Sequence, residues 1–270
     1  MNESKMRLVG QTALITGANS GIGYAVAMNM AKEGANIIIN YVSNEEAAFA
    51  AVESAKLLGN GKVIALKADV SKEDEVQAMF AEAIKTFGTI DILVNNAGLQ
   101  KDSPFADMTL AQWQLVIDVN LTGQFLCSRE AVREFTRRGA VPYSKAIGKI
   151  ICMSSVHEMI PWAGHANYAA SKGGVMLLMK TMAQELGPQK IRINSIGPGA
   201  IKTPINTSAW NTPEAEAKLL KLIPYKRVGV PDDIGDVAVF LASEEADYIH
   251  GTTIYVDGGM TLFPEFATGG

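Results

Sequence analysis

A serine, a tyrosine and a lysine lie in the second half of the sequence at a spacing that could support proton transfer. Ser155 follows a short apolar run, and Tyr168 precedes Lys172 by four residues. Residues four apart share one face of a helix, so the Lys172 ammonium can lie beside the Tyr168 phenol. A free phenol has a pKa of about 10, and lowering it by ~3 units requires ~4 kcal/mol of preferential stabilisation of the phenolate. A neighbouring cation supplies such stabilisation, although an isolated Tyr-x-x-x-Lys is more often an ordinary surface pair.

A glycine-rich turn near the amino terminus could hold a phosphate group. Residues 12–16 are typical of a buried strand and lead into Gly17-Ala-Asn-Ser-Gly21-Ile-Gly23 and a helix that reaches about Glu33. Glycines let the backbone turn tightly and let a pyrophosphate approach the amides at the positive end of a helix. The spacing is not the common Gly-x-Gly-x-x-Gly fingerprint, so the flanking strand and helix are what favour phosphate binding.

Short apolar runs alternate with helical segments along the whole chain. We expect strands at residues 12–16, 36–40, 62–67, 90–94, 150–153, 192–196 and 253–256. We expect helices up to residue 33 and at 45–58, 71–87, 109–137, 168–186 and 231–241, with capping-box spacing at 71–74 and 109–112. This alternation predicts an α/β fold: a doubly wound parallel sheet with helices on both faces, in a single domain over residues 1–270.

Three segments depart from regular structure. Asn120 and Gly123 are poor mid-helix residues and predict a local irregularity. Residues 138–148 form a loop whose Tyr143 and Lys145 we interpret as surface residues. Residues 205–225, in which Thr212 precedes Pro213 as the expected helix cap, are polar for a core segment and predict a mobile lid. The tail, residues 257–270, is apolar, so we expect its side chains to be packed against other protein surface and not exposed to water.

Composition excludes several classes of protein. The 270 residues are 48% hydrophobic with a net charge of −4 and no basic block, which argues against nucleic-acid and membrane-surface partners. The charged first ten residues do not form a signal peptide, and no apolar run approaches the roughly 18 residues of a membrane helix. Cys127 and Cys152 indicate buried thiols of a cytoplasmic protein. The three histidines have no neighbouring cluster of carboxylates or cysteines, so we expect no metal site.

Together these motifs resemble the short-chain dehydrogenase/reductase family over nearly the whole chain. The matching positions are Thr16-Gly17-x-x-x-Gly21-x-Gly23, Asp69, Asn95-Asn96-Ala97-Gly98, Asn120, Ser155, Tyr168-x-x-x-Lys172 and Pro198-Gly199. The resemblance implies a Rossmann-like fold of about seven strands, a nicotinamide dinucleotide cofactor and a homotetramer.

The resemblance also implies a role for each catalytic candidate. Tyr168 would be the general acid/base, and its phenolate would be favoured by Lys172 and by the positive nicotinamide of the oxidised cofactor. Ser155 would hydrogen-bond the reacting oxygen, and Asn120 would hold a water that links Lys172 to solvent. Lys172 would also hold the nicotinamide ribose. Substrate contacts are expected at Ser155, His157 and Tyr168, although His157 is as consistent with bracing its own loop.

The cofactor is expected along the carboxyl ends of the strands, where open α/β sheets bind ligands. The expected cofactor contacts are Gly17, Asn19, Ser20, Gly21, Ile22, Gly23, Tyr41, Asp69, Val70, Asn96, Ala97, Gly98, Tyr168, Lys172, Pro198, Gly199 and Ile201. Residues 40–44 carry no charge after the second strand, and Glu45 and Glu46 follow. We therefore expect the enzyme to accept NAD or NADP, with a lean towards NAD.

Within the family, residues 154–162, 197–206 and 257–266 look like those of glucose 1-dehydrogenases. This implies oxidation of the C1 hydroxyl of glucose, or of a similar sugar, to the lactone. Gln100 and Val42 stand where those enzymes tend to have glutamate and arginine, and the loop at 138–148 is longer than expected. The alternatives are a 3-oxoacyl or ketone reductase and a non-catalytic dinucleotide-binding regulator, which would not need an intact acid/base set.

Overall fold

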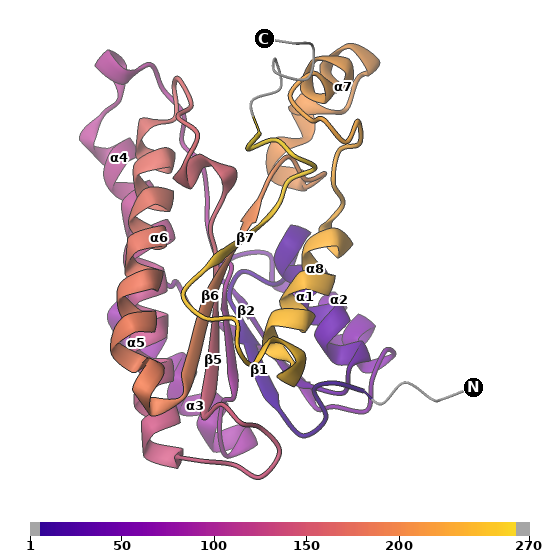
Figure 1. The fold of residues 1–270 in the computed structure, drawn as a ribbon, viewed down its shortest axis with the longest axis vertical. Helices are drawn as coiled ribbons and strands as arrows, with labels where there is room; N and C mark the ends of the chain where they lie inside the picture. Colours follow the sequence, from indigo (N-terminus) through magenta and orange to yellow (C-terminus); the bar gives the residue numbers. More distant parts are fainter. Residues whose placement is uncertain (1–5, 263–270) are drawn as a thin grey trace.

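A parallel sheet of seven strands forms the centre of the molecule (Figure 1). The computed structural model describes residues 6–262, so residues 263–270 of the apolar tail, which we expect to be covered, lie outside the described residues. The strands are β1 (Thr12–Ile15), β2 (Asn36–Tyr41), β3 (Val63–Lys67), β4 (Ile92–Asn95), β5 (Gly148–Met153), β6 (Ile191–Pro198) and β7 (Thr253–Val256). Their order is β3-β2-β1-β4-β5-β6-β7, which confirms the predicted doubly wound sheet.

Helices cover both faces of the sheet, as Figure 1 shows. One face packs against α1 (Gly21–Lys32), α2 (Glu45–Lys56) and α8 (Pro231–Ala242). The other packs against α3 (Glu73–Phe87), α5 (Gly123–Arg138) and α6 (Ala166–Leu186). The other two α-helices of the described residues, α4 (Leu110–Ile117) and α7 (Pro213–Leu220), lie near the carboxyl ends of the strands, where the site is expected.

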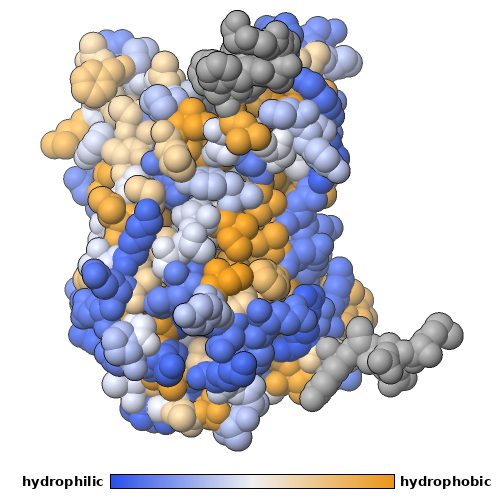
Figure 2. Space-filling model, viewed as in Figure 1, coloured by the Kyte–Doolittle hydropathy of each residue, from blue (hydrophilic) through white to orange (hydrophobic). Residues whose placement is uncertain are grey.

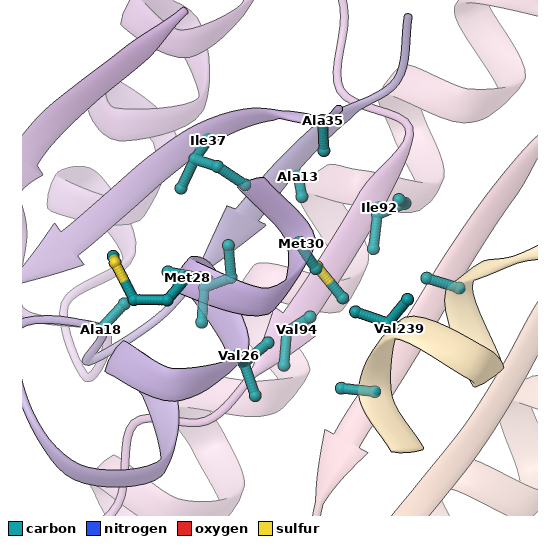
Figure 3. Close-up of a cluster of buried hydrophobic side chains, with 14 of the residues drawn as sticks. Ala13, Ala18, Val26, Met28, Met30, Ala35, Ile37, Ile92, Val94 and Val239 are labelled. Atoms are coloured by element: carbon teal, nitrogen blue, oxygen red, sulfur yellow. The ribbon is translucent and has the colours of Figure 1, made fainter. Parts of the chain in front are cut away.

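Strands β1 to β6 send side chains into two separate cores, one on each face of the sheet. Ile37 and Ile39 of β2 enter the core shared with α1 and α8, while Ile38 between them enters the opposite core. Figure 3 shows the first core, where Met30 and Val26 of α1 lie between the sheet and Val239 of α8. Strands buried on both faces read as continuous apolar runs, which is why the sequence predicts most of them correctly.

The helix caps agree with the sequence in two places and differ in one. Thr109 and Gln112 form the expected capping box at α4, and Thr212 caps α7 ahead of Pro213. The capping box expected at residues 71–74 is wrong, because α3 begins at Glu73 without a side-chain cap. The Ser71 hydroxyl instead donates to Asp69 Oδ1 at 2.7 Å, so a local turn takes the polar group that would have capped the helix.

The helix predicted over residues 109–137 is interrupted where Asn120 and Gly123 predicted an irregularity. A π-helical turn, Asp118–Thr122, joins α4 to α5. Asn120 is fully buried within this turn. A Cβ at Gly123 would come within 2.8 Å of Val70 Cγ2, so the close approach of α5 to the end of β3 requires glycine there.

The loop between α5 and β5 is anchored at the edge of the sheet where the strands begin. The Tyr143 hydroxyl donates to Asp91 Oδ1 at 3.0 Å. Ser144 Oγ and the Lys145 backbone N–H donate to the two oxygens of Glu244, at 2.7 and 3.0 Å. Tyr143 and Lys145 reach solvent as expected, but the loop itself is held by specific partners.

Two further expectations concern burial and membranes. Cys127 and Cys152 are buried free thiols, as predicted. In the described part of the chain, no helix has the length and apolar character needed to cross a bilayer.

Candidate functional site

The glycine turn between β1 and α1 has the geometry of a phosphate cradle. Gly17 and Gly21 have positive φ angles of 60° and 57°, which favour glycine. A Cβ at Gly23 would lie 2.4 Å from Asn96 Nδ2 and 2.6 Å from the Gly17 carbonyl oxygen, so this position also excludes any side chain. Ser20 precedes α1 without a side-chain cap, and the first turn has no acidic residue. The amides at this helix end therefore fit an anionic pyrophosphate.

The turn is held to β4 by a reciprocal set of hydrogen bonds. Thr16 Oγ1 accepts from the backbone N–H groups of Asn96 and Ala97, both at 2.9 Å. Asn96 Nδ2 donates back to the carbonyls of Thr16 and Gly17 at 2.8 and 3.1 Å. These bonds hold the segment after β4, which leads into the expected cofactor contact Gly98, against the glycine turn.

Asn40 is a part of the site that sequence reasoning missed. It is 2% exposed at the end of β2. Its Oδ1 accepts from Gly17 N–H at 3.1 Å, and its Nδ2 donates to the Ala68 carbonyl at 3.0 Å. Asn40 therefore sets the glycine turn against the end of β3. The available signal was an amide at the end of an otherwise apolar strand.

The residues expected at the adenosine end gather around the loop after β2. Asn19 Nδ2 donates to the Ser43 carbonyl at 2.9 Å, which ties the glycine turn to this loop. The Tyr41 hydroxyl donates to Glu45 Oε1 at 2.9 Å, and its ring is nearly buried. Val70 is also buried, and the Asp69 carboxylate accepts from Ser71. Ile22 packs against the core beneath the cradle.

Ser155, Tyr168 and Lys172 lie together at the carboxyl end of β5, as the sequence predicts. The Lys172 ammonium is 5.5 Å from the centre of the Tyr168 ring and donates to the Met153 carbonyl at 2.8 Å. Burial lowers the pKa of Lys172 to about 8. Burial raises the pKa of Tyr168, while hydrogen bonding with Ser155 and Gln100 acts in the opposite direction.

This balance differs from the lowered phenol pKa that the sequence suggested. In the protein alone, removal of the phenol from water outweighs its hydrogen bonds. A further positive charge beside Tyr168 would lower the pKa of its phenol and favour the phenolate. The oxidised nicotinamide ring expected beside it would supply that charge.

Asn120 braces the site through its side chain. Its Oδ1 accepts from Leu99 N–H at 2.8 Å, and its Nδ2 donates to the Leu99 carbonyl at 3.0 Å and to Ser171 Oγ at 3.2 Å. It thus joins the π-helical turn to the loop after β4 and to the first turns of α6. The expected water link to Lys172 stays a prediction.

The loop after Ser155 is held by its own side chains. His157 Nδ1 lies 3.0 Å from the Ile160 carbonyl oxygen, and the His157 ring stacks on Trp162 at 4.4 Å between centroids. The same ring meets Tyr168 edge-on at 6.3 Å. The His157 ring therefore braces its own loop and lies edge-on to the Tyr168 ring. Contact of His157 with a substrate stays a prediction.

The Glu158 carboxylate is hydrogen-bonded within the protein. Its carboxylate accepts from the Ser154 hydroxyl and from the Tyr255 hydroxyl of β7, the latter at 2.7 Å. Burial and this carboxylate raise the pKa of Tyr255. The Glu158 carboxylate therefore links β7 to the loop that follows Ser155.

The remaining expected contacts follow β6. Pro198 ends the strand, and a Cβ at Gly199 would lie 2.7 Å from Asp257 Cα, so the chain passes too closely for a side chain. Ile201 is nearly buried and forms a bridge with Gly229. Beyond it, the short helix Pro204–Ala209 and α7 contain no buried residue. Such weak packing suits the predicted lid.

Comparisons with known proteins agree with this geometry. Residues 17–261 match the family model described as enoyl-(acyl carrier protein) reductase. The chain is 47% identical over 262 residues to 3beta-hydroxysteroid dehydrogenase 1 of Eggerthella lenta, covering 97% of this chain and 98% of the relative. It is 40% identical over 258 residues to glucose 1-dehydrogenase 2 of Bacillus subtilis, covering 95% and 97%.

A solved structure with the same architecture is a gluconate 5-dehydrogenase from Burkholderia cenocepacia in complex with NADP and tartrate. Its TM-score is 0.87 at 35% identity, with 95% of this chain and 97% of that chain covered. The matches extend over nearly the full length of the chain, and the glycine cradle and the Ser155–Tyr168–Lys172 cluster agree with them. The chain therefore belongs to the short-chain dehydrogenase/reductase family of oxidoreductases.

Proposed function

We propose that this enzyme oxidises a secondary hydroxyl on a ring, with Tyr168 as general base and Ser155 as the partner of the reacting oxygen. The observation that carries the proposal is the cluster of Ser155, Tyr168 and the Lys172 ammonium at the sheet edge that also holds the glycine cradle. A nicotinamide dinucleotide bound there would take up the hydride.

Side chains of the protein transfer the proton of the substrate hydroxyl. Ser155 orients the substrate hydroxyl towards Tyr168, and the phenolate of Tyr168 accepts its proton as the carbonyl forms. Lys172, charged below a pKa of about 8, favours that phenolate from one turn along α6. Asn120 holds α6 and the loop after β4 in register with these groups. In the reverse direction the same phenol donates its proton to the carbonyl oxygen.

The surroundings of Tyr168 favour a substrate with an apolar ring. Met159 and Trp162, on the loop that follows Ser155, are 64% and 41% exposed. His157 and Glu158, the polar side chains near Ser155 on that loop, contact the Ile160 carbonyl and the Tyr255 hydroxyl. A hydroxylated polycyclic compound, such as the substrate class named for the Eggerthella relative, would cover Met159 and Trp162.

Glucose is the second candidate. It is favoured by the resemblance of residues 154–162 to glucose 1-dehydrogenases and by the identity to the Bacillus relative. Gln100, beside Tyr168, could hydrogen-bond a sugar hydroxyl, but it lacks the charge of a glutamate. A 3-oxoacyl or ketone reductase remains a third reading, in which the same groups work in the reductive direction.

A substrate panel tests these readings. Purified enzyme would be given NAD or NADP with a 3β-hydroxysteroid, a simple cyclic alcohol and glucose, and reduced cofactor with a 3-oxoacyl thioester. We expect the highest kcat/KM with the hydroxysteroid. A higher kcat/KM with glucose would make the sugar the substrate, and activity confined to the thioester would select the reductase. Cofactor binding without turnover of any compound would contradict an enzyme.

For the cofactor, we propose a preference for NAD. Val42, the residue after β2, is 57% exposed and carries no charge. The nearby Asn19 side-chain amide donates to the Ser43 carbonyl. The Glu45 carboxylate lies beside the same loop and accepts from the Tyr41 hydroxyl. A 2′-phosphate would meet negative charge and no arginine in this region.

For the assembly, we propose a homotetramer. Leu115, Phe125 and Leu177 of α4, α5 and α6 are 44%, 43% and 61% exposed. Figure 1 places these three helices side by side along one flank, and Figure 2 shows apolar side chains at its upper end. Association through this flank would remove them from water. A monomer at micromolar concentration in light scattering would contradict the proposal.

A further inference from the structure

We propose that Gln124 is a positioning residue for Lys172: it gives the Met153 carbonyl a second donor, which frees Lys172 to engage the cofactor and Tyr168. This inference rests on the proposed roles of Tyr168 and Lys172. It adds a residue of α5 that the family motifs quoted above do not include.

The two side chains meet at one backbone oxygen. Lys172 Nζ donates to the Met153 carbonyl at 2.8 Å, and Gln124 Nε2 donates to the same oxygen at 3.2 Å. Gln124 is 2% exposed and lies four residues after Asn120, one helical turn along. Met153 is the last residue of β5, immediately before the serines of the catalytic loop.

Burial of the Gln124 amide at this position is energetically unfavourable. Its Oε1 is buried without a hydrogen-bond partner among residues 6–262. Burying an amide with one unsatisfied end destabilises a fold, whereas a leucine of similar size would not. The hydrogen bond to Met153 is the one polar contact that this side chain makes within the described chain. The position therefore points to a requirement for a donor at that carbonyl.

The other groups near Lys172 do not compete strongly for its ammonium. Burial raises the pKa of the neighbouring Cys152 thiol to about 12, so the thiol is neutral. The Glu158 carboxylate accepts hydrogen bonds from the Ser154 and Tyr255 hydroxyls. The Met153 carbonyl is thus the acceptor that holds Lys172 away from Tyr168.

Sharing that acceptor makes the release of Lys172 easier. When Lys172 turns towards the cofactor ribose, the buried carbonyl keeps its hydrogen bond from Gln124. Without Gln124, the same movement would leave the oxygen without either of these donors, which is unfavourable for a buried backbone group. Lys172 would then remain on Met153 for a larger fraction of the time.

The test replaces Gln124 with leucine and, separately, with methionine, neither of which can donate. We expect the dissociation constant of the oxidised cofactor, measured by quenching of tryptophan fluorescence, to rise about 3- to 10-fold. We also expect the acidic limb of the kcat/KM profile for alcohol oxidation to move up by about 0.5 to 1 pH unit, because the Tyr168 phenolate loses support. A purely structural role for Gln124 would change the melting temperature without moving this limb.

Cys127→Ala is the matched control. Cys127 lies on the same helix, is fully buried and belongs to the hydrophobic core on the opposite face of the sheet from the one that Met153 enters. This variant should keep the wild-type dissociation constant and pH profile. Wild-type values for both Gln124 variants would overturn the proposal, and so would equal shifts in Cys127→Ala. Retained turnover in Tyr168→Phe would instead contradict the proposed acid/base role, so the two failures are distinguishable.

Discussion

Glu244→Gln should destabilise the protein at neutral pH while leaving catalysis unchanged. The Glu244 carboxylate accepts from Ser144 Oγ, from the Lys145 backbone N–H and from Lys149 Nζ, at 2.7, 3.0 and 3.1 Å. Lys149 is 1% exposed, and its ammonium also donates to Gln11 Oε1 at 2.7 Å. Glutamine keeps one oxygen acceptor but removes the negative charge that faces this buried cation.

The magnitude follows from the burial of the two partners. Breaking a fully buried ion pair costs about 3 to 5 kcal/mol, because one charge is left uncompensated. The Glu244 side chain is 33% exposed, so water partly replaces it, and we expect a loss of about 1 to 3 kcal/mol in the free energy of unfolding.

The effect should depend on pH in one direction. Burial would raise the pKa of Glu244, but hydrogen bonds from Lys145 and Ser144, together with the Lys149 charge, outweigh it and hold the pKa below its usual value. A depressed carboxyl pKa stabilises the fold above the unfolded value of about 4.3 and loses that stabilisation as pH falls through the folded value. The difference between wild type and Glu244→Gln should therefore be full at pH 7 and shrink below pH ~4.

Urea denaturation at neutral and acidic pH measures this difference. Glu245→Gln is the control, since its side chain is 60% exposed and lies 3.9 Å from Arg7; it should change stability by less than ~0.5 kcal/mol. A Glu244→Gln variant as stable as wild type at pH 7, or equally destabilised at both pH values, would refute the reasoning.

Three further changes test the site. Gly23→Ala places a Cβ against Asn96 Nδ2 and the Gly17 carbonyl; we expect a loss of about 2 to 4 kcal/mol in stability by urea denaturation, and weaker cofactor binding by fluorescence titration. Val42→Arg should shift the kcat/KM ratio towards NADP by about 1 to 3 kcal/mol, because arginine can pair with the 2′-phosphate. Burial lowers the pKa of Lys172 to about 8, so wild-type kcat/KM should fall above that pH; Lys172→Ala should lack this limb and lose both turnover and cofactor affinity.

Much of the fold could be predicted because its signals are local. Apolar runs marked the strands, and the glycines at 17, 21 and 23 marked the cradle where positive φ angles or close contacts are found. Asn120 and Gly123 predicted a local irregularity, because both are poor helix-interior residues, and the structure has a π-helical turn there. Ser155, Tyr168 and Lys172 lie together because β5 ends, and α6 begins, at the same edge of the sheet.

What the sequence did not predict depends on partners distant in the chain. The Tyr255 hydroxyl that occupies Glu158 comes from a residue 97 positions away. The side-chain amides of Asn40 and Gln124 bond backbone groups distant in the chain: Gly17 and Ala68 for Asn40, and Met153 for Gln124. The phenol pKa also depends on tertiary burial, which spacing along a helix does not reveal.

The most direct test of the account is Tyr168→Phe, measured for both turnover and cofactor binding. The substitution removes the proton-transfer group and leaves the glycine cradle unchanged. We expect turnover to fall by about 10²- to 10⁴-fold while the dissociation constant of the oxidised cofactor stays within about twofold of wild type. Turnover above about one tenth of wild type would contradict Tyr168 as the general acid/base.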